Sequence, residues 1–433
     1  MTSSVTTKVL GDCLLGLGRG QSPRYVERES PVRAINQKCI RNGTVDVTYA
    51  RAHDPLGFVK EFALLQDGDV CINSTGTGTI GRIGLWAPFP GETDRFFADS
   101  HVTIIRPNNA VVNSGYLAAL LQSPAVQTAL ETYCFSGSTN QVELNKSALS
   151  DLKLSVLSRN EQDMVAKVIT GIDRVMQKTE ALIVKQQRIR TGLMQDLLTK
   201  GIDEHGNIRS EATHSFKDSL LGRIPVEWDV SPAENLCEAV IDCKNRTPPE
   251  AAEGHPVIRT PNVRDGEFVS TGLAFTDSAS YEIWTARGRP KAGDVVITRE
   301  APFGEACIIP EGLLAPCLGQ RMMMYQPDPN MVRADYLVYA IYSQRVQQKL
   351  LELAGGSTVG HVRVGDIRAL PIPHPVDVKE QEKITLVLNG VSTALKDKLS
   401  SQSKLASLRS GLMHDLLTGG RCVTPLFAQA VAE

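Results

Sequence analysis

Nothing in this chain of 433 residues points to a metal centre, a disulfide framework or a membrane span. Its nine cysteines are scattered, and the closest two, Cys237 and Cys243, have no histidine near them. Scattered cysteines of this kind are usually reduced thiols. No apolar run approaches the roughly 18 residues that a spanning helix needs. The first residues lack the charged and apolar segments of a secretory signal. We therefore expect a cytoplasmic protein without membrane association.

The motifs of several enzyme classes are also missing. There is no Gly-x-Ser-x-Gly nucleophile turn and no Gly-x-x-x-x-Gly-Lys-Ser/Thr phosphate loop. The eight histidines show neither His-x-x-x-His nor His-Glu-x-x-His spacing, so a zinc site on one helix is not expected. The Asn-Pro-Pro-aromatic and Asp-Pro-Pro-aromatic tetrapeptides, with which amino-methyltransferases hold a target base, are absent. We predict a non-catalytic chain that binds no cofactor, although an active site of dispersed residues would leave no such trace.

Acidic and basic residues nearly balance over the whole chain, but not near its beginning. The formal net charge of −2 gives no overall attraction to nucleic acid. Between Lys8 and Arg51, however, basic residues outnumber acidic ones. A local basic face is sufficient for phosphate contacts, and an ordinary solvated surface has the same composition. The basic residues between these two are Arg19, Arg24, Arg28, Arg33, Lys38 and Arg41, against Asp12, Glu27, Glu29 and Asp46.

The chain repeats itself at an interval of 219 residues. The octapeptide GLMQDLLT at 192–199 returns as GLMHDLLT at 411–418. The same interval separates the Glu-Gln pair at 161–162 from the pair at 380–381. A duplication of this length indicates two similar structural units that do similar work at two places.

Each repeat predicts a mixed α/β unit. In the first, strands are predicted at 69–72 and 101–105, and a helix at 116–132. The second has the same order, with strands at 293–297 and 322–325 and a helix from Tyr336. Each unit then reaches a Gly-Ser-Thr loop and leaves it in an extended exit, at 152–154 or 370–373. The prolines of the second exit exclude a helix there.

A long helix is predicted after each unit. Its apolar residues alternate three and four positions apart, which is the heptad spacing of a coiled-coil seam. At about 1.5 Å per residue each helix extends roughly 55 Å and needs a partner to cover its seam. The other copy is the natural partner, and a two-fold relation makes the pair antiparallel. The expected seam is Val165, Val168, Ile172, Val175, Thr179, Leu182, Gln186, Ile189 and Leu193, and then Ile384, Val387, Val391, Ala394, Lys398, Ser401, Leu405, Leu408 and Leu412.

The sequence GTGTIG at 76–81 matches the G-x-G-x-x-G fingerprint of dinucleotide binding and follows a predicted strand. The next residues, 82–88, predict another strand instead of the helix whose N-terminus would hold a pyrophosphate. The matching segment of the second unit, 301–304, lacks the three glycines. We therefore predict a strand–turn–strand hairpin with glycine at positive φ, and no nucleotide site.

The polar tips of this hairpin and of its counterpart are candidate contacts to DNA. Similar backbones with different polar tips are what two readers of two different sequences would need. Arginine suits guanine and a carboxylate suits cytosine in the major groove; ordinary loop variation is the alternative. The candidates are Ser74, Thr75, Thr77, Thr79 and Arg82 in the first unit and Arg299, Glu300 and Glu305 in the second.

A second pair of loops adds further candidates. Asn and Gln can pair with adenine, and hydroxyls can contact phosphate; a helix cap explains the Ser-Thr pairs equally well. These residues are Ser138, Thr139, Asn140 and Gln141 in the first unit and Ser357, Thr358 and His361 in the second. Lys244, Asn245, Arg246 and Arg259 are further basic or polar candidates.

Together these features resemble the specificity subunit of type I restriction–modification systems over nearly the whole chain. The resemblance rests on two recognition-like units, each followed by a long helix that ends in the repeated octapeptide. It also rests on LGRIPVEW at 221–228, LPIP at 370–373, and the Gly-Asp-Val hairpins, of which the second continues into REAP at 299–302. The first unit departs from the pattern, with the plainer exit LKL at 152–154 and no LGxIPxxW opening.

The resemblance implies an α/β (α+β) chain with pseudo-two-fold symmetry, in which two tandem target recognition domains are separated by long helices that form an antiparallel coiled coil. The predicted divisions follow the repeat. They are target recognition domain 1 at 1–155, a central helix at 156–200, a polar joint at 201–216, target recognition domain 2 at 217–374, a C-terminal helix at 375–420 and a tail at 421–433.

The family further implies a non-catalytic subunit that binds double-stranded DNA. Each recognition domain would read one half of a bipartite asymmetric target, and the helices would set the gap and dock two modification subunits. Those methyltransferase subunits would carry S-adenosylmethionine and methylate a flipped adenine. Restriction subunits, with ATP and magnesium, would join them for cleavage. An added helical turn near 199–201 should then lengthen the gap. A coiled-coil assembly scaffold without DNA specificity is the alternative.

Overall fold

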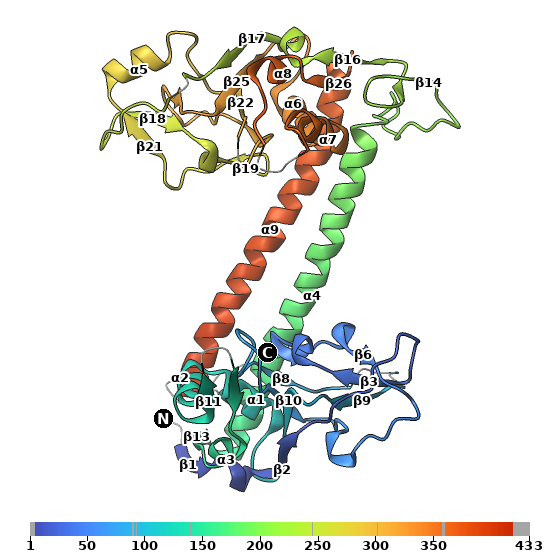
Figure 1. Cartoon of the computed structure of the whole chain (residues 1–433), viewed down its shortest axis with the longest axis vertical. Helices are drawn as coiled ribbons and strands as arrows, with labels where there is room; N and C mark the ends of the chain where they lie inside the picture. The colour runs from blue at the N-terminus through green and yellow to red at the C-terminus, as the bar shows by residue number, and fades with distance from the viewer. Residues whose placement is uncertain are drawn as a thin grey trace, which may run out of the picture. The chain divides into compact units, whose positions relative to one another are not determined.

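A computed structural model of the chain describes residues 5–88, 91, 93–138, 141–244, 246–300, 302–356 and 360–418 (Figure 1). The chain divides into two compact units. Unit 1 comprises Met1–Leu182 and Lys398–Glu433, and unit 2 comprises Ile183–Asp397. Among the described residues, every helix is too short or too polar to cross a bilayer.

The body of unit 1 is built on a six-stranded mixed sheet. Its strands are β2 (Leu14–Arg19), β4 (Ile40–Arg41), β5 (Gly43–Val45), β7 (Val70–Asn73), β8 (Ile83–Leu85) and β10 (Val102–Pro107). The strand order is β2-β10-β7-β8-β5-β4. The central strands are antiparallel, with Ile104 opposite Cys71 and Cys71 opposite Gly84. All four residues of β7 are buried, as expected of a short apolar run covered on both faces.

Smaller groups of strands complete this body. They are β1 (Val5–Val9), β3 (Val32–Ile35), β6 (Arg51–Ala52), β9 (Arg95–Ala98), β11 (Phe135–Ser138), β12 (Gln141–Leu144) and β13 (Lys153–Leu157). Strands β6, β3 and β9 form a second sheet, and β11 pairs with β12. The antiparallel pair of β1 and β13, with Val5 opposite Leu157, brings the beginning of the body to its predicted extended exit.

The helix predicted at 116–132 is wrong as one element. The structure has α1 (Ser114–Gln122), α2 (Pro124–Ala129) and a π-helical turn at Leu130–Cys134. The break falls at Ser123, whose ψ of 144° is extended, because the ring of Pro124 disfavours helical backbone in the residue before it. A short helix, α3 (Lys146–Ser150), follows and is capped by Asn145.

Unit 2 repeats the design. Its main strands are β16 (Trp228–Pro232), β17 (Cys237–Asp242), β18 (His255–Ile258), β21 (Ala274–Thr276), β22 (Val295–Thr298), β23 (Ala306–Ile308), β24 (Cys317–Leu318), β25 (Met322–Pro327) and β26 (Pro371–Pro375). Two small antiparallel pairs are added: β14 (Phe216–Lys217) pairs with β15 (Ile224–Pro225), and β19 (Val263–Arg264) pairs with β20 (Glu267–Phe268). The order β17-β25-β22-β23 corresponds to β2-β10-β7-β8, and β21-β18-β24 to β6-β3-β9. The pair of β16 and β26 corresponds to β1 and β13.

The helices of unit 2 follow the same plan. They are α5 (Ser278–Trp284), α6 (Ala334–Ile341), α7 (Gln344–Leu353) and α8 (Val364–Arg368). A buried tyrosine on the first helix of each pair fastens the exit strand. The Leu157 backbone N–H donates to the Tyr116 hydroxyl at 3.2 Å, and the Tyr336 hydroxyl donates to the Pro373 carbonyl at 3.0 Å. Both predicted exits are therefore confirmed as strands.

Two long helices, α4 (Arg159–Leu197) and α9 (Val378–Leu417), contribute to both units. In unit 1, Val165 near the start of α4 shares a core with Leu416 at the end of α9, and Arg409 bonds to Asp173. In unit 2, Leu197 at the end of α4 shares a core with Ile384 near the start of α9. The helical segments within each unit therefore run in opposite directions.

The predicted seam of α4 has the right period but is wrong at every second position after Ile172. Val175, Leu182 and Ile189 are 48, 50 and 41% exposed. The neighbouring residues Met176, Ile183 and Arg190 face inward instead. The predicted positions Thr179 and Gln186 are half-buried. Because Val175-Met176 and Leu182-Ile183 are adjacent apolar pairs, heptad spacing alone fits either member.

The same displacement occurs in α9. Val387 and Leu408 are 39 and 52% exposed, and Ser401 is also exposed. Leu388, Gln402 and Arg409 take their places on the covered side. These three residues stand 219 positions after Ile169, Ile183 and Arg190, respectively, which lie on the covered side of α4. The observed seam therefore keeps the repeat of the sequence.

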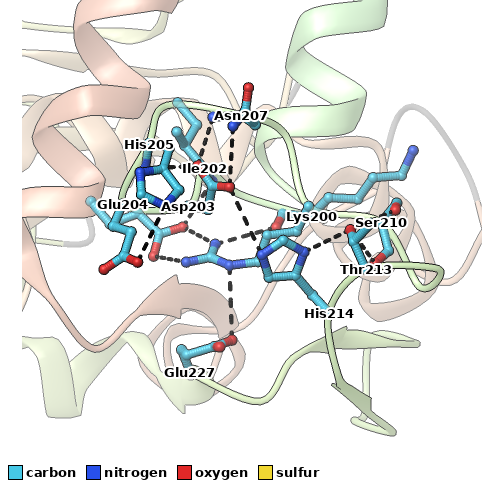
Figure 2. A network of polar contacts seen from close by, with 12 residues as sticks. Lys200, Ile202, Asp203, Glu204, His205, Asn207, Ser210, Thr213, His214 and Glu227 are labelled. Carbon is cyan, nitrogen blue, oxygen red and sulfur yellow. Dashed lines mark hydrogen bonds and ion pairs between the residues drawn. The ribbon is translucent and has the colours of Figure 1, made fainter.

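The polar segment at 201–216 lies within unit 2, and Figure 2 shows the network of polar contacts around Asp203, His214 and Glu227. A buried carboxylate, that of Glu380, holds the segment in place. Glu380 accepts hydrogen bonds from Arg209 Nη1 at 2.5 Å and Nη2 at 3.0 Å. It also accepts from Trp228 Nε1 and from the backbone N–H of Ile202, each at 3.0 Å. Gly201 has a φ of +67°, and a Cβ there would lie 2.2 Å from Glu380 Oε1. A residue inserted at 199–201 would therefore disturb this contact.

Candidate nucleic-acid interface

Strands β7 and β8 form the predicted hairpin. Ile72 lies opposite Ile83, and the connecting turn has Gly76, Gly78 and Gly81 at φ values of +98°, +76° and +80°. Such values favour glycine because it has no Cβ. The hairpin prediction is confirmed, and the turn leads into a strand without the helix N-terminus that would hold a dinucleotide phosphate.

The five candidates on this turn differ in exposure. Thr77 and Arg82 are exposed, and the Arg82 guanidinium donates to the Gly78 carbonyl at 2.9 Å. Thr75 and Thr79 are half-buried, and the Thr75 hydroxyl accepts from Gln37 Nε2 at 2.6 Å. Ser74 is fully buried, with its hydroxyl 2.5 Å from that of Thr103. Thr77 and Arg82 are thus the side chains that this turn presents to solvent.

The matching hairpin, β22 with β23, has a more charged tip. Arg299 is only 8% exposed, and its Nε is buried without a hydrogen-bond partner. Glu300 lies 2.8 Å from Arg321 Nε and 2.9 Å from His361 Nδ1, so two predicted residues, Glu300 and His361, are brought together. Glu305 accepts from the Tyr342 hydroxyl at 2.7 Å, which ties it to α6–α7.

In each unit three segments meet at the hairpin tip, and we call this place the tip junction. In unit 1, Thr75 forms a β-bridge with Glu143, while the Ser74 N–H donates to the His101 carbonyl at 2.8 Å. The Leu144 N–H donates back to the Ser74 carbonyl at 2.9 Å. Arg19 closes the group by donating to Glu143 Oε2 at 3.1 Å. One hollow of the surface is lined by Thr75, His101, Glu143 and Arg19.

The tip junction of unit 2 has the same backbone connections. Glu300 forms a β-bridge with His361, and the Arg299 N–H donates to the Arg321 carbonyl at 2.9 Å. The Val362 N–H donates to the Arg299 carbonyl at 3.0 Å. Arg321 has a φ of +76°, a conformation uncommon for a residue with a side chain.

Sequence reasoning missed four members of the tip junctions: Arg19, His101, Glu143 and Arg321. Arg19 lies within the basic stretch noted in the sequence, but nothing local distinguished it. Arg19 and Glu143 are 124 residues apart in the chain and meet only through the strand ladders. Only the duplication could have pointed to these residues. Superposing the bridge Thr75–Glu143 on the bridge Glu300–His361 identifies the equivalent positions of the two units.

Two further candidates surround one tryptophan. Lys244 Nζ lies 5.0 Å and the Arg246 guanidinium 5.2 Å from the centre of the Trp284 ring, a cation–π arrangement. Arg246 is exposed and its carbonyl accepts from Trp284 Nε1. Arg259, by contrast, donates to the Gly272 carbonyl at 3.2 Å and is half-buried.

Several arginines of the basic stretch near the N-terminus lie over aromatic rings. The guanidinium of Arg41 lies 4.1 Å from the centre of the Tyr49 ring and that of Arg51 3.6 Å from the Tyr25 ring. Arg51 is exposed and Arg41 is half-buried, so Arg51 in particular presents its charge to solvent, where a phosphate could contact it. This stretch stays a candidate for the DNA backbone.

For the remaining candidates, all in the second pair of loops or at Asn245, no side-chain position is described. Thr139, Asn140, Asn245, Ser357 and Thr358 lie outside the described residues. Ser138 and Gln141 face each other in the β11–β12 ladder, and only their backbone is described.

The described part of the chain contains no cluster of metal ligands and no disulfide. No three His, Cys, Asp or Glu side chains there gather closely enough to hold a metal ion. The eight described cysteines are all unpaired. Burial raises the pKa of Cys39 to about 11 and that of Cys237 to about 12, and a thiol that stays protonated is a poor nucleophile.

The Gly-Asp-Val hairpins bury one aspartate in each unit. Asp69 accepts from Arg106 Nε and Nη2, both at 2.8 Å. Its counterpart Asp294 accepts from the neutral Gln326 amide at 3.0 Å. Burial, with no cation bonded to it, raises the pKa of Asp294 above its usual value. These aspartates support the hairpins that carry the tip junctions.

Known proteins with a similar sequence or fold include specificity subunits of type I restriction systems. Residues 225–402 match the family model of the type I restriction modification DNA specificity domain. The putative type I restriction enzyme MjaX specificity subunit of Methanocaldococcus jannaschii is 24% identical over 343 residues, which cover 78% of this chain and 75% of that protein. The MjaVIII specificity subunit of the same organism is 22% identical over 280 residues, 64% of each chain.

Solved structures show the same fold. The S subunit of a type I restriction–modification system from M. genitalium aligns with a TM-score of 0.61 at 12% identity, over 96% of each chain. A chain solved for complex assembly and conformational transition of the type I R-M system aligns at 0.52 and 16% identity, over 95% of this chain and 97% of that one.

The chain therefore carries the DNA specificity domain of type I restriction–modification systems. Over most of its length it is similar to the specificity subunits of those systems. The resemblance predicted from the sequence is confirmed, and with it a role in DNA sequence specificity.

Proposed function

We propose that this chain reads a bipartite, asymmetric DNA target, with one half of the target contacted by each unit. The observation that carries this proposal is the duplicated tip junction. The backbone connections are the same in both units, while the side chains differ: Thr75 corresponds to Glu300, and Glu143 to His361. One backbone design with two sets of polar groups fits the recognition of two different sequences.

In this proposal α4 and α9 form an antiparallel coiled coil that fixes the distance between the half-sites. The corrected seam supports it, because inward residues recur at alternating steps of three and four in both helices. The target recognition domains at 1–155 and 217–374 would then be held at opposite ends of this spacer.

Partners would supply the chemistry. Two modification subunits would dock on the helices, where Val175, Leu182 and Ile189 of α4 stay exposed at helical spacing. S-adenosylmethionine would bind to those subunits, and ATP and magnesium to restriction subunits. This chain would be non-catalytic, cytoplasmic and free of bound cofactors.

Methylation mapping tests the proposal. DNA is sequenced for methyladenine from cells that express the accompanying modification subunit, with and without this chain. Methylation of one split motif that depends on the chain is the expected result. A stable complex without such methylation would favour the scaffold alternative.

Binding of the purified complex to duplex DNA provides a second test. Phosphate contacts release counterions, so affinity should fall steeply as salt concentration rises. A scaffold that binds only protein would show no such DNA affinity.

A further inference from the structure

The two tip junctions contain the same three kinds of ionisable side chain at exchanged positions. Unit 1 has Arg19, His101 and Glu143; unit 2 has an arginine where unit 1 has its histidine, and a histidine where unit 1 has its glutamate. The glutamate of unit 2, Glu300, takes the place of Thr75. One arginine, one histidine and one glutamate therefore recur, although no single position is kept.

Stability does not explain this recurrence. The side chains concerned are 28 to 59% exposed, and ion pairs in contact with solvent add little to stability. In unit 2 the arginine is held in a left-handed backbone conformation, and a neighbouring buried arginine has an unpartnered Nε. Backbone strain and unsatisfied groups of this kind gather at binding sites.

An adjacent arginine and glutamate match one base pair better than the others. In the major groove guanine offers two acceptors, O6 and N7, and its cytosine partner offers the N4 donor. A guanidinium donates to the first two, and a carboxylate accepts from the third. Arg19 with Glu143, 3.1 Å apart, and Arg321 with Glu300, 2.8 Å apart, each present donors beside an acceptor.

We infer that the tip junction is the base-reading site of each unit and that each junction selects a G·C pair within its half-site. In the free chain the arginine and glutamate are paired with each other. On DNA they exchange that contact for the edge of the base pair, so neither group is left without a partner. This inference rests on the proposed function and names the side chains that would set the sequence.

The test compares Glu143→Gln with Glu300→Gln in the complete complex by methylation mapping. Each substitution removes one carboxylate and keeps the size of the side chain. We expect a wild-type motif with a G·C pair in each half. Each variant should relax one position in one half only, a different half for each, with preference falling on the order of tenfold or more.

Arg223→Gln is the matched control. Arg223 Nε lies 2.9 Å from Glu211 in an exposed ion pair of the same unit as Glu300, outside the tip junction. This variant should keep the wild-type motif. If it relaxes the motif as Glu300→Gln does, the assignment to the junction is wrong.

The outcomes separate the two claims. If the wild-type chain directs no split-motif methylation, the proposed function fails. If it does, but a half-site has no G·C pair or both glutamine variants keep the wild-type preferences, the inference is overturned. Should Glu300→Gln prevent assembly, Glu143→Gln decides alone, because Glu143 is 59% exposed and its loss should leave the fold intact.

Discussion

The two units share a backbone plan but give equivalent polar groups different partners. The carboxylate at the third residue of each long helix shows this well. In unit 1, Glu161 accepts from the backbone N–H and hydroxyl of Ser158, a local cap of α4. In unit 2, Glu380 accepts from Arg209, Trp228 and Ile202 and holds the segment that follows α4. The same residue at the same helix position thus caps its own helix in unit 1 and binds a distant segment in unit 2.

The largest expected effect follows from removing this carboxylate. Glu380→Ala leaves Arg209, 7% exposed, as a buried charge without its bidentate partner, with only the longer contact of 3.9 Å to Glu227. Unit 2 should lose about 3–5 kcal/mol. Glu161→Ala removes this cap and should cost unit 1 about 1 kcal/mol. Hydrogen exchange measured peptide by peptide reports the two units separately. Equal losses in the two variants would contradict the comparison.

A second difference concerns the aspartate of each Gly-Asp-Val hairpin. Arg106→Gln gives unit 1 the partner that unit 2 has naturally. Asp69 is 1% exposed, so its charge would be left buried and the unit should lose about 3 kcal/mol. Chemical denaturation with Trp86 fluorescence as the reporter for unit 1 measures the loss. Adding Asp69→Asn should restore most of it, and a double variant as unstable as the single one would argue against the ion pair.

A third difference lies in the helix seam. Arg409 donates to Asp173 at 2.5 Å, whereas Arg190, 219 residues earlier, donates to the Ser392 hydroxyl at 3.3 Å. Asp173→Ser should destabilise unit 1 by about 2 kcal/mol, because both partners are largely buried. Ser392→Asp should stabilise unit 2 by under about 1 kcal/mol. Melting temperatures of the two variants should shift in opposite directions, and a shared direction would refute the equivalence.

The smallest effect is a dependence on pH. The pKa of Asp294 is raised in the folded chain, so the folded state binds more protons than the unfolded state above about pH 4. The free energy of unfolding should therefore fall as pH rises from there through the folded pKa. Asp294→Asn should remove this contribution to the slope and stabilise unit 2 at neutral pH. Unfolding curves at several pH values check this, and an unchanged slope would contradict it.

The sequence predicted those features that depend on local pattern. Strands at 70–73 and 102–107 and the two long helices followed from apolar spacing, and the turn at 76–81 from its glycines. The break at Ser123 was missed even though Pro124 marks it. In the seam, apolar spacing selected Ile189 and Leu408 instead of their neighbours Arg190 and Arg409, yet each arginine has a partner there.

The tip junctions were predicted only in part. Glu300 and His361 were proposed from base chemistry, but their contact depends on a β-bridge between distant segments. Arg19 and Glu143 carried no local signal, since strand ladders decide which distant residues meet. Burial also divides the candidates of the first hairpin into buried and exposed ones: Ser74 is buried, while Thr77 and Arg82 face solvent.

The most direct test of the account lengthens both helices at equivalent places. One heptad is inserted after Lys178 in α4 and one after Asp397 in α9, positions 219 residues apart on exposed helix surface and away from the Glu380 contact. Seven residues add about 10.5 Å, or about three base pairs of DNA. Methylation mapping should then show both half-motifs unchanged and the gap between them longer. An unchanged gap, with methylation retained, would contradict the claim that the helices set the spacing.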